Sequence, residues 1–116
     1  MTYVMPFVAR RMITFKLEVT NSWNFIYWIV VGGVTIQETD PGFTYIGSWS
    51  NHPGGWAESQ VALSTAEFTF DSSLTFELHS DLQTFGGTGK VYLDNVFQQN
   101  VDYNGTDTDV IMFSYP

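Results

Sequence analysis

The 116-residue sequence contains no cysteine and only four basic residues. Without cysteine the chain has no disulfide bond, no thiolate metal ligand and no thiol nucleophile. The basic residues Arg10, Arg11, Lys16 and Lys90 face twelve acidic ones, and the formal net charge is −8. Nucleic acids require a basic footprint, and anionic membranes require clustered Lys or Arg. We therefore expect no nucleic-acid partner and no membrane insertion.

The sequence also lacks a long apolar segment and a clear secretory signal. The apolar run Phe25–Val31 is too short to cross a bilayer. In the N-terminal stretch MTYVMPFVARRMITF, the two arginines follow the apolar residues instead of preceding them, and no small-residue cleavage site is evident. This pattern predicts a cytoplasmic or non-classically secreted protein.

Motifs of catalysis are missing as well. The chain has no Gly-x-Ser-x-Gly elbow and no pair of carboxylates on a common motif. Its two histidines, His52 and His79, belong to no recognisable catalytic arrangement, and His79 at the end of an expected strand is either a solvated edge residue or a ligand. We expect the protein not to be an enzyme.

What the sequence does contain is an excess of aromatic side chains. Hydrophobic residues make up 44% of the chain, and four Trp, six Tyr and ten Phe are more than a core of this size usually needs. The length is that of one domain, residues 1–116, with enough apolar residues to bury a core. The surplus rings are expected at the surface, where they can contact a sugar or another protein.

Short strands dominate the expected secondary structure. From Ile13 to Thr20, apolar and polar residues alternate with a period of two, while Trp56–Leu63 is the one ambiguous stretch. Glycine, asparagine and serine mark turns between the segments. About eight strands at such intervals are typical of a sandwich or barrel. The other expected strands are Phe25–Val31, Val34–Gln37, Phe43–Ser50, Glu67–Phe70, Leu74–His79, Lys90–Asp94 and Val110–Ser114.

Three segments carry a resemblance to a known family. They read TDPGFTYIGSWS (Thr39–Ser50), AEFTFDSSL (Ala66–Leu74) and GKVYLDN (Gly89–Asn95). In this order they resemble the galactose-binding-like jelly roll, in the form common in fungal, especially basidiomycete, extracellular proteins. The resemblance implies an all-β jelly-roll sandwich and a non-catalytic module. The chain departs from the family where Asp71-Ser72 replaces a Gly-Thr turn and Asn95 replaces a glycine.

The order of the segments is rotated relative to that family. Residues 1–33 resemble its closing strands and residues 34–116 its opening strands, so the sequence predicts a circularly permuted sandwich. Alternatively, the strands within 13–31 complete the sandwich of a neighbouring copy, which would build an oligomer or a filament by strand exchange. The apolar residues that would then mediate assembly are Phe15, Leu17, Val19, Phe25, Tyr27 and Ile29.

A second group of residues points to carbohydrate binding. Proteins recognise sugars by stacking an aromatic ring on a pyranose face and by binding the hydroxyl groups with amides, carboxylates and hydroxyls. The segment from Trp49 to Trp56 places such groups on one exposed loop, and a glycine-rich loop, Gln83–Gly89, can border the same site. The sequence thus predicts a lectin-like module that binds a glycan. Its candidate ligand-binding residues are Asn51, His52, Trp56, Trp49, Gly86 and Gly87.

The acidic segment near the C-terminus raises two further options. Asp102, Asp107 and Asp109 offer oxygen ligands for calcium, but the spacing lacks the glycine and terminal glutamate of an EF-hand, and a solvated acidic loop is the commoner outcome. We expect no cofactor. The tripeptide Asn104-Gly105-Thr106 is a glycosylation sequon that has meaning only in the secretory pathway.

Overall fold

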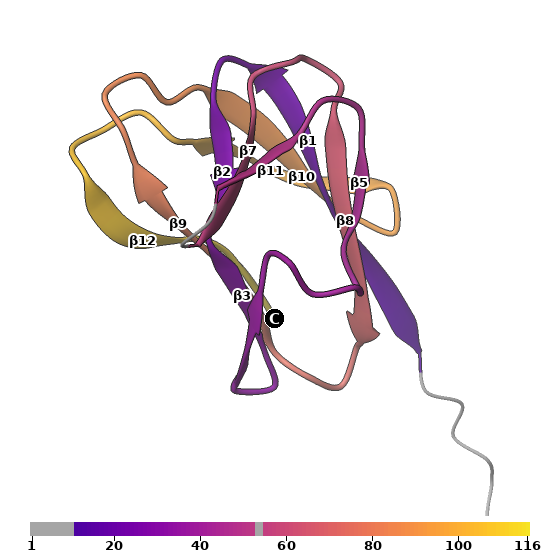
Figure 1. The fold of residues 1–116 in the computed structure, drawn as a ribbon. Coiled ribbons are helices and arrows are strands. Elements are labelled where there is room, and N and C mark those ends of the chain that lie inside the picture. The colour runs from indigo at the N-terminus through magenta and orange to yellow at the C-terminus, as the bar shows by residue number, and fades with distance from the viewer. Residues whose placement is uncertain (1–10, 53–54) are drawn as a thin grey trace, which may run out of the picture.

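The computed structural model describes residues 11–52 and 55–116, and every regular element in them is a strand (Figure 1). The expectation of an all-β protein is therefore confirmed. The described part of the chain contains no helix with the length and hydropathy needed to span a bilayer. The strands are β1 (Met12–Asn21), β2 (Asn24–Ile26), β3 (Trp28–Val31), β4 (Val34–Gln37), β5 (Thr44–Ile46), β6 (Ser50–His52), β7 (Trp56–Ser59), β8 (Thr65–Asp71), β9 (Phe76–Leu82), β10 (Thr88–Leu93), β11 (Val96–Asp102) and β12 (Thr108–Tyr115).

The strands form three antiparallel sheets that pack as a sandwich. One sheet has five strands in the order β11-β10-β1-β8-β5. Facing it are a four-stranded sheet, β12-β9-β3-β4, and a three-stranded sheet, β2-β7-β6. The chain crosses between the layers several times, since β8 lies in the five-stranded sheet, β9 in the four-stranded sheet and β10 in the five-stranded sheet again. The predicted β-sandwich is confirmed.

The central strand of the five-stranded sheet is β1, between β8 and β10 (Figure 1). Its alternation directs Ile13, Phe15, Leu17 and Val19 into the core, and the last three are fully buried. Phe15 packs against Phe76 from the opposite layer, with ring centroids 4.6 Å apart. The predicted inward face of this segment is therefore confirmed.

Pairing of the N-terminal strands takes place within one chain. Phe15 lies opposite Leu93 on β10 and Phe68 on β8, while Ile29 lies opposite Leu78 on β9. Phe25 and Ile29 are buried in the same core as Phe15. Strand exchange would require these pairings to form between copies instead, so that alternative remains a prediction from the sequence.

The segment Phe25–Val31 forms two strands instead of the single buried strand that we expected. The part before Tyr27 pairs with β7, and the part after it pairs with β4 and β9. At the bend, the Tyr27 backbone N–H donates to the carbonyl of His79 at 3.1 Å. The segment thus contributes one strand to the three-stranded sheet and one to the four-stranded sheet, and Tyr27 lies between these two strands.

Two further strands lie in segments that the sequence left unassigned, and the expectation for His79 was wrong. Trp56–Ser59 is a strand, which resolves the ambiguous stretch, and Val96–Asp102 is an edge strand whose mostly exposed residues show no alternation. His79 lies inside β9 rather than at its end, half-buried, with its ring 5.3 Å from that of Trp28. Because every residue of β11 except Val101 is exposed, its sequence carries no period-two signal.

Both ends of the described chain lie at the turn between β8 and β9. The carbonyl of Arg11 accepts a hydrogen bond from the Ser72 N–H at 2.8 Å. Tyr115 pairs with Phe76, the first residue of β9, and its ring packs edge-on against Phe70 at 5.7 Å. Because Ile13 also lies opposite Phe70, the first and last strands begin and end at the same edge of the sandwich.

Candidate functional site

The hairpin of β6 and β7 separates the predicted site residues into two groups. Asn51 lies opposite Ala57, and His52 lies opposite Trp56. Because side chains alternate along a strand, the first pair faces one side of the hairpin and the second pair faces the other. Each side borders a pocket of its own, so the predicted residues do not form a single site.

The first pocket, which we call the Trp56 pocket, has a volume of about 440 Å³. It lies between the three-stranded sheet and the loops that follow β9 and precede β12. Its aromatic lining consists of Trp23, Phe25, Tyr27, Trp56 and Phe85. Its polar lining consists of Glu58, Asp81, Gln83 and Asp107.

Trp56 forms a fixed wall of this pocket. Its ring is nearly parallel to those of His52 and Tyr27, with centroids 4.6 Å and 5.5 Å away. Its Nε1–H donates to Oε1 of Glu58 at 2.7 Å, and His52 Nε2 lies 2.7 Å from the same oxygen. These contacts hold Trp56 half-buried in a row of cross-strand rings, so it is less free to stack on a ligand than the sequence suggested.

The freely exposed ring of the pocket belongs to Phe85. This side chain is 57% exposed and packs edge-on against buried Phe25, with centroids 6.1 Å apart. It lies in the predicted glycine-rich loop, directly before Gly86 and Gly87. The sequence pattern predicts the two glycines of this loop as site residues but not the aromatic residue beside them.

Gly86 and Gly87 have a structural role in the described fold. The Gly87 N–H donates to the carbonyl of Trp23 at 2.8 Å, and the Gly86 N–H donates to that of Gln83 at 2.9 Å. A Cβ on either glycine would overlap backbone atoms of a neighbouring segment, Tyr103 for Gly86 and Asn21 for Gly87. The two glycines therefore let the loop lie flat against the sandwich and position Phe85 at the rim.

The polar side of the Trp56 pocket is dominated by Asp81. Burial, followed by the nearby carboxyls of Asp109 and Asp107, raises the pKa of its carboxyl to about 7. Its Oδ1 atom is buried without a hydrogen-bond donor among the described residues. The neighbouring Gln83 donates from Nε2 to Oδ1 of Asp107 at 3.3 Å. Burial and the charges of Asp81 and Asp107 also raise the pKa of Tyr27 to about 12.

The raised pKa of Asp81 predicts a pH-dependent stability. Its folded value, about 7, lies above the usual 3.8, so between these values the folded protein holds a proton that the unfolded chain has lost. The contribution of Asp81 to stability is therefore present below about pH 4 and is lost as the pH rises through 7. Thermal unfolding followed by circular dichroism measures this effect. We expect the melting temperature of the wild type minus that of Asp81→Asn to be larger at pH 5 than at pH 8. A difference that does not change with pH would contradict this.

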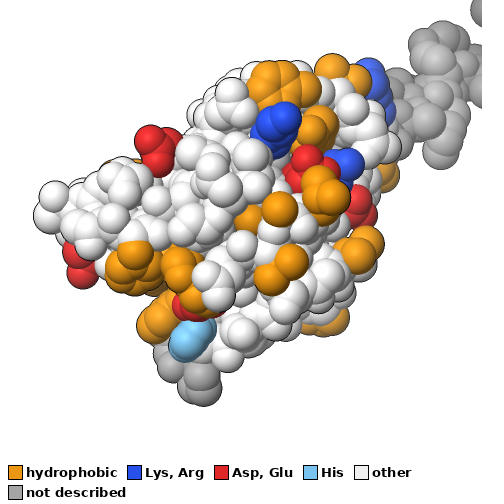
Figure 2. Space-filling model, turned by 90° about the horizontal axis from the view of Figure 1, so that it is seen from above, with side chains coloured by type: hydrophobic (Ala, Val, Ile, Leu, Met, Phe, Trp, Pro, Cys, Tyr) orange, Lys and Arg blue, Asp and Glu red, His pale blue; other side chains and the backbone are white. Residues whose placement is uncertain are grey.

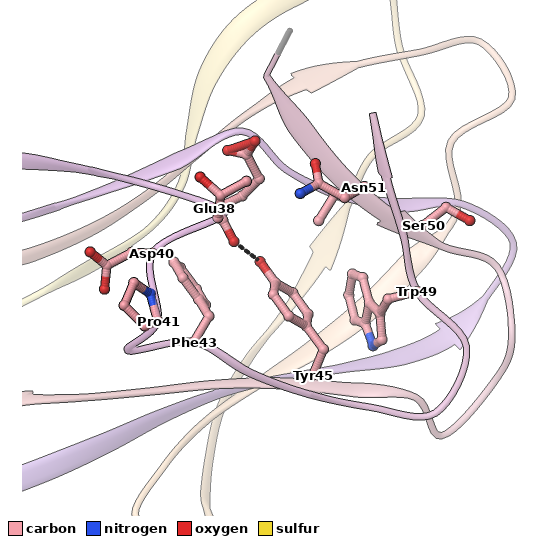
Figure 3. Close-up of a pocket in the computed structure, with 10 residues that line it drawn as sticks. Glu38, Asp40, Pro41, Phe43, Tyr45, Trp49, Ser50 and Asn51 are labelled. Carbon is pink, nitrogen blue, oxygen red and sulfur yellow. Dashed lines mark hydrogen bonds between the residues drawn. The ribbon is translucent and has the colours of Figure 1, made fainter. Parts of the chain in front are cut away.

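The second pocket, which we call the Glu38 pocket, has a volume of about 430 Å³ and lies on the opposite side of the β6–β7 hairpin (Figure 3). Trp49 and Asn51 line it, together with Glu38, Phe43 and Tyr45. Trp49 is half-buried and borders this space. Of the predicted ligand-binding residues, two thus line the Glu38 pocket, and Trp56, with His52 stacked on it, belongs to the other.

The three carboxylates considered as calcium ligands do not lie together. Asp102 accepts a hydrogen bond from the Asn104 N–H at 2.9 Å and so caps its own turn, whereas Asp107 and Asp109 approach Asp81. Within residues 11–52 and 55–116, no group of three or more His, Asp or Glu side chains is arranged to hold a metal ion. The amide of Asn104, the sequon residue, is exposed and donates to the carbonyl of Thr84 at 2.9 Å.

Basic side chains lie away from both pockets. None of the described Lys or Arg residues lines either one. Arg11 lies 3.9 Å from Asp94, and Lys16 donates to Asn95 while resting 4.7 Å from the centre of the Tyr92 ring. Figure 2 shows the blue side chains gathered at one side of the face drawn, with hydrophobic side chains dispersed over it. Both pockets are therefore acidic and aromatic.

Comparison of the chain with protein-family models, with curated proteins and with solved structures gave no match.

Proposed function

We propose that this protein is a non-catalytic, lectin-like module that binds a glycan in the Trp56 pocket. The observation that carries the proposal is the combination of an exposed aromatic ring, Phe85, with two carboxylates, Asp81 and Asp107, and an amide, Gln83, around one pocket of about 440 Å³. Pockets of this size enclose small ligands or a few sugar units.

The two kinds of lining match the two faces of a sugar. The C–H face of a pyranose ring is apolar and packs on an aromatic ring, for which Phe85 and the half-buried Trp23 are available. Sugar hydroxyls are hydrogen-bond donors, and the buried Oδ1 of Asp81 lacks one. A hydroxyl donated to this oxygen would satisfy a polar atom that is costly to leave unpaired.

Two features of the fold support the family resemblance behind this proposal. The five-stranded sheet contains all three resembling segments in part, as β5, β8 and β10, with β1 inserted between β8 and β10. Both ends of the described chain also reach the β8–β9 turn, as a circular permutation requires. We propose on these grounds a permuted galactose-binding-like jelly roll, a fold class that hosts non-catalytic sugar-binding modules.

Phe85→Ala is expected to weaken glycan binding about tenfold with little effect on stability. Aromatic packing of this kind contributes about 1 kcal/mol beyond its area, and loss of the apolar contact adds to that. Because the ring is 57% exposed, the fold should lose little when it is removed. A glycan array would identify the ligand, and isothermal titration calorimetry would compare the variants.

Leu63→Ala is the matched control, because Leu63 is 75% exposed and lines neither pocket. It should leave glycan affinity unchanged. A protein that binds no glycan on the array would refute the proposed function. Equal affinity of wild type and Phe85→Ala would instead show that the sugar binds elsewhere.

A further inference from the structure

Glu38 is a buried carboxylate without a partner in the described structure. Its side chain is only 4% exposed, and its Oε2 atom is buried with no hydrogen-bond donor in residues 11–52 and 55–116. Among the described residues it forms no ion pair either. Buried carboxylates in proteins are normally paired or hydrogen-bonded, because transfer of a charge out of water is costly. The unpaired oxygen therefore indicates a missing partner.

The aromatic residues around Glu38 do not supply that partner. The Tyr45 hydroxyl donates to the backbone carbonyl of Glu38 at 2.7 Å, as the dashed line in Figure 3 shows, and Trp49 Nε1–H donates to the carbonyl of Ile46 at 3.2 Å. Burial and then the charge of Glu38 raise the pKa of Tyr45, so this hydroxyl stays protonated. Both ring donors are thus committed to the backbone, and the carboxylate remains free to accept from a ligand.

The same rings build an apolar wall beside the carboxylate. Phe43, Tyr45 and Trp49 follow one another, with successive centroids 5.6 Å and 5.3 Å apart. In Figure 3, Asn51 reaches toward this space from β6 on the side opposite the rings. No described Lys or Arg lines the pocket. The site therefore offers the unpaired Glu38 carboxylate, the Asp40 carboxylate, which accepts from the Gly42 N–H, aromatic surface and no described cation.

From this geometry we propose that the Glu38 pocket binds a small organic cation, a compound with a primary or methylated ammonium group. The ammonium group pairs with the Glu38 carboxylate, and its carbon substituents pack on Tyr45 and Trp49. Aromatic faces attract such cations, and the attraction is greatest where water is excluded. A volume of about 430 Å³ suits a ligand of this size. This site is separate from the Trp56 pocket, and the proposal does not depend on glycan binding there.

Choline and its uncharged isostere 3,3-dimethylbutan-1-ol test the charge requirement on the unmodified protein. Both have the same shape, so an apolar pocket would bind them alike. We expect choline, followed by calorimetry and by backbone-amide NMR shifts around Glu38 and Trp49, to bind at least tenfold more tightly than the alcohol. Equal affinity of the two, or no binding of choline at millimolar concentration, would overturn the proposal.

Glu38→Gln tests the assigned partner, with Glu58→Gln as the matched control. Both variants remove one negative charge, but Glu58 lines the Trp56 pocket. We expect Glu38→Gln to lose at least tenfold in choline affinity and to melt a few degrees higher, because an unpaired buried charge is gone. Glu58→Gln should keep choline binding. Unchanged choline affinity in Glu38→Gln, or a fall in its melting temperature, would overturn the proposal.

Discussion

Phe15→Ala is expected to lower the free energy of unfolding by about 4 kcal/mol, within the range for loss of a buried phenylalanine. Phe15 is fully buried at the middle of the central strand β1, and its ring lies 4.6 Å from Phe76 and 6.2 Å from Phe113. Truncation removes the contact between the two layers and leaves a cavity that strands paired on both sides cannot close. A loss of this size is a large part of the stability of a small domain.

Denaturant unfolding followed by tryptophan fluorescence measures this effect. Phe97→Ala is the control, because Phe97 belongs to the edge strand β11 of the same sheet and is 50% exposed. Removal of its ring should lower the free energy of unfolding by about 1 kcal/mol, mainly because the edge-on contact with Tyr92 at 5.9 Å is lost. If both variants lost the same small amount of stability, β1 would not be the central strand of this chain's own sandwich.

Gly87→Ala is expected to destabilise the protein by about 3 kcal/mol, the upper end of the usual cost of overpacking. An added Cβ would overlap the Asn21 carbonyl and lie 2.6 Å from the Cβ of Ser22. The obstructing atoms belong largely to the backbone at the end of β1, which cannot move without breaking its pairing with β10. For a domain of this size the melting temperature should fall by roughly 12 °C.

Gly33→Ala is the informative comparison for Gly87→Ala. Gly33 has a positive φ of 81° but no atom within 4 Å of an added Cβ. Gly33→Ala should lower the free energy of unfolding by only about 1 kcal/mol, because alanine is disfavoured in a left-handed backbone conformation. Differential scanning calorimetry separates the two cases. A smaller melting shift for Gly87→Ala than for Gly33→Ala would mean that the loop before β10 does not lie against β1.

The fold class was predictable because its strongest signal is local. Alternation from Ile13 to Thr20 defines an inward face without knowledge of the partner strands, and the structure buries those residues. The bend at Tyr27 was not predictable, because it arises where one strand leaves β7 and joins β9. Such a division depends on contacts between segments distant in the sequence.

The two pockets were predictable only in part. The segment from Trp49 to Trp56 contributes to both of them, but reading it as one loop concealed the hairpin that turns Asn51 and Trp56 to opposite sides. Period-two alternation across that hairpin could have revealed the division. No sequence signal marks Glu38, because its burial results from packing of the segment after β4 and not from its neighbours in the chain.

The meeting of both described ends at the β8–β9 turn determines which way the Trp56 pocket faces when the chain is held there. Phe85 and Asp107 lie near the far termini of β9 and β12, the opposite edge of the sandwich from Phe76 and Tyr115. A bead, a vesicle or a fused carrier attached through Pro116 would therefore hold the Trp56 pocket outward. Immobilised copies would display a uniformly oriented array of pockets, in which the proposed binding of a repetitive glycan would gain avidity from many weak contacts.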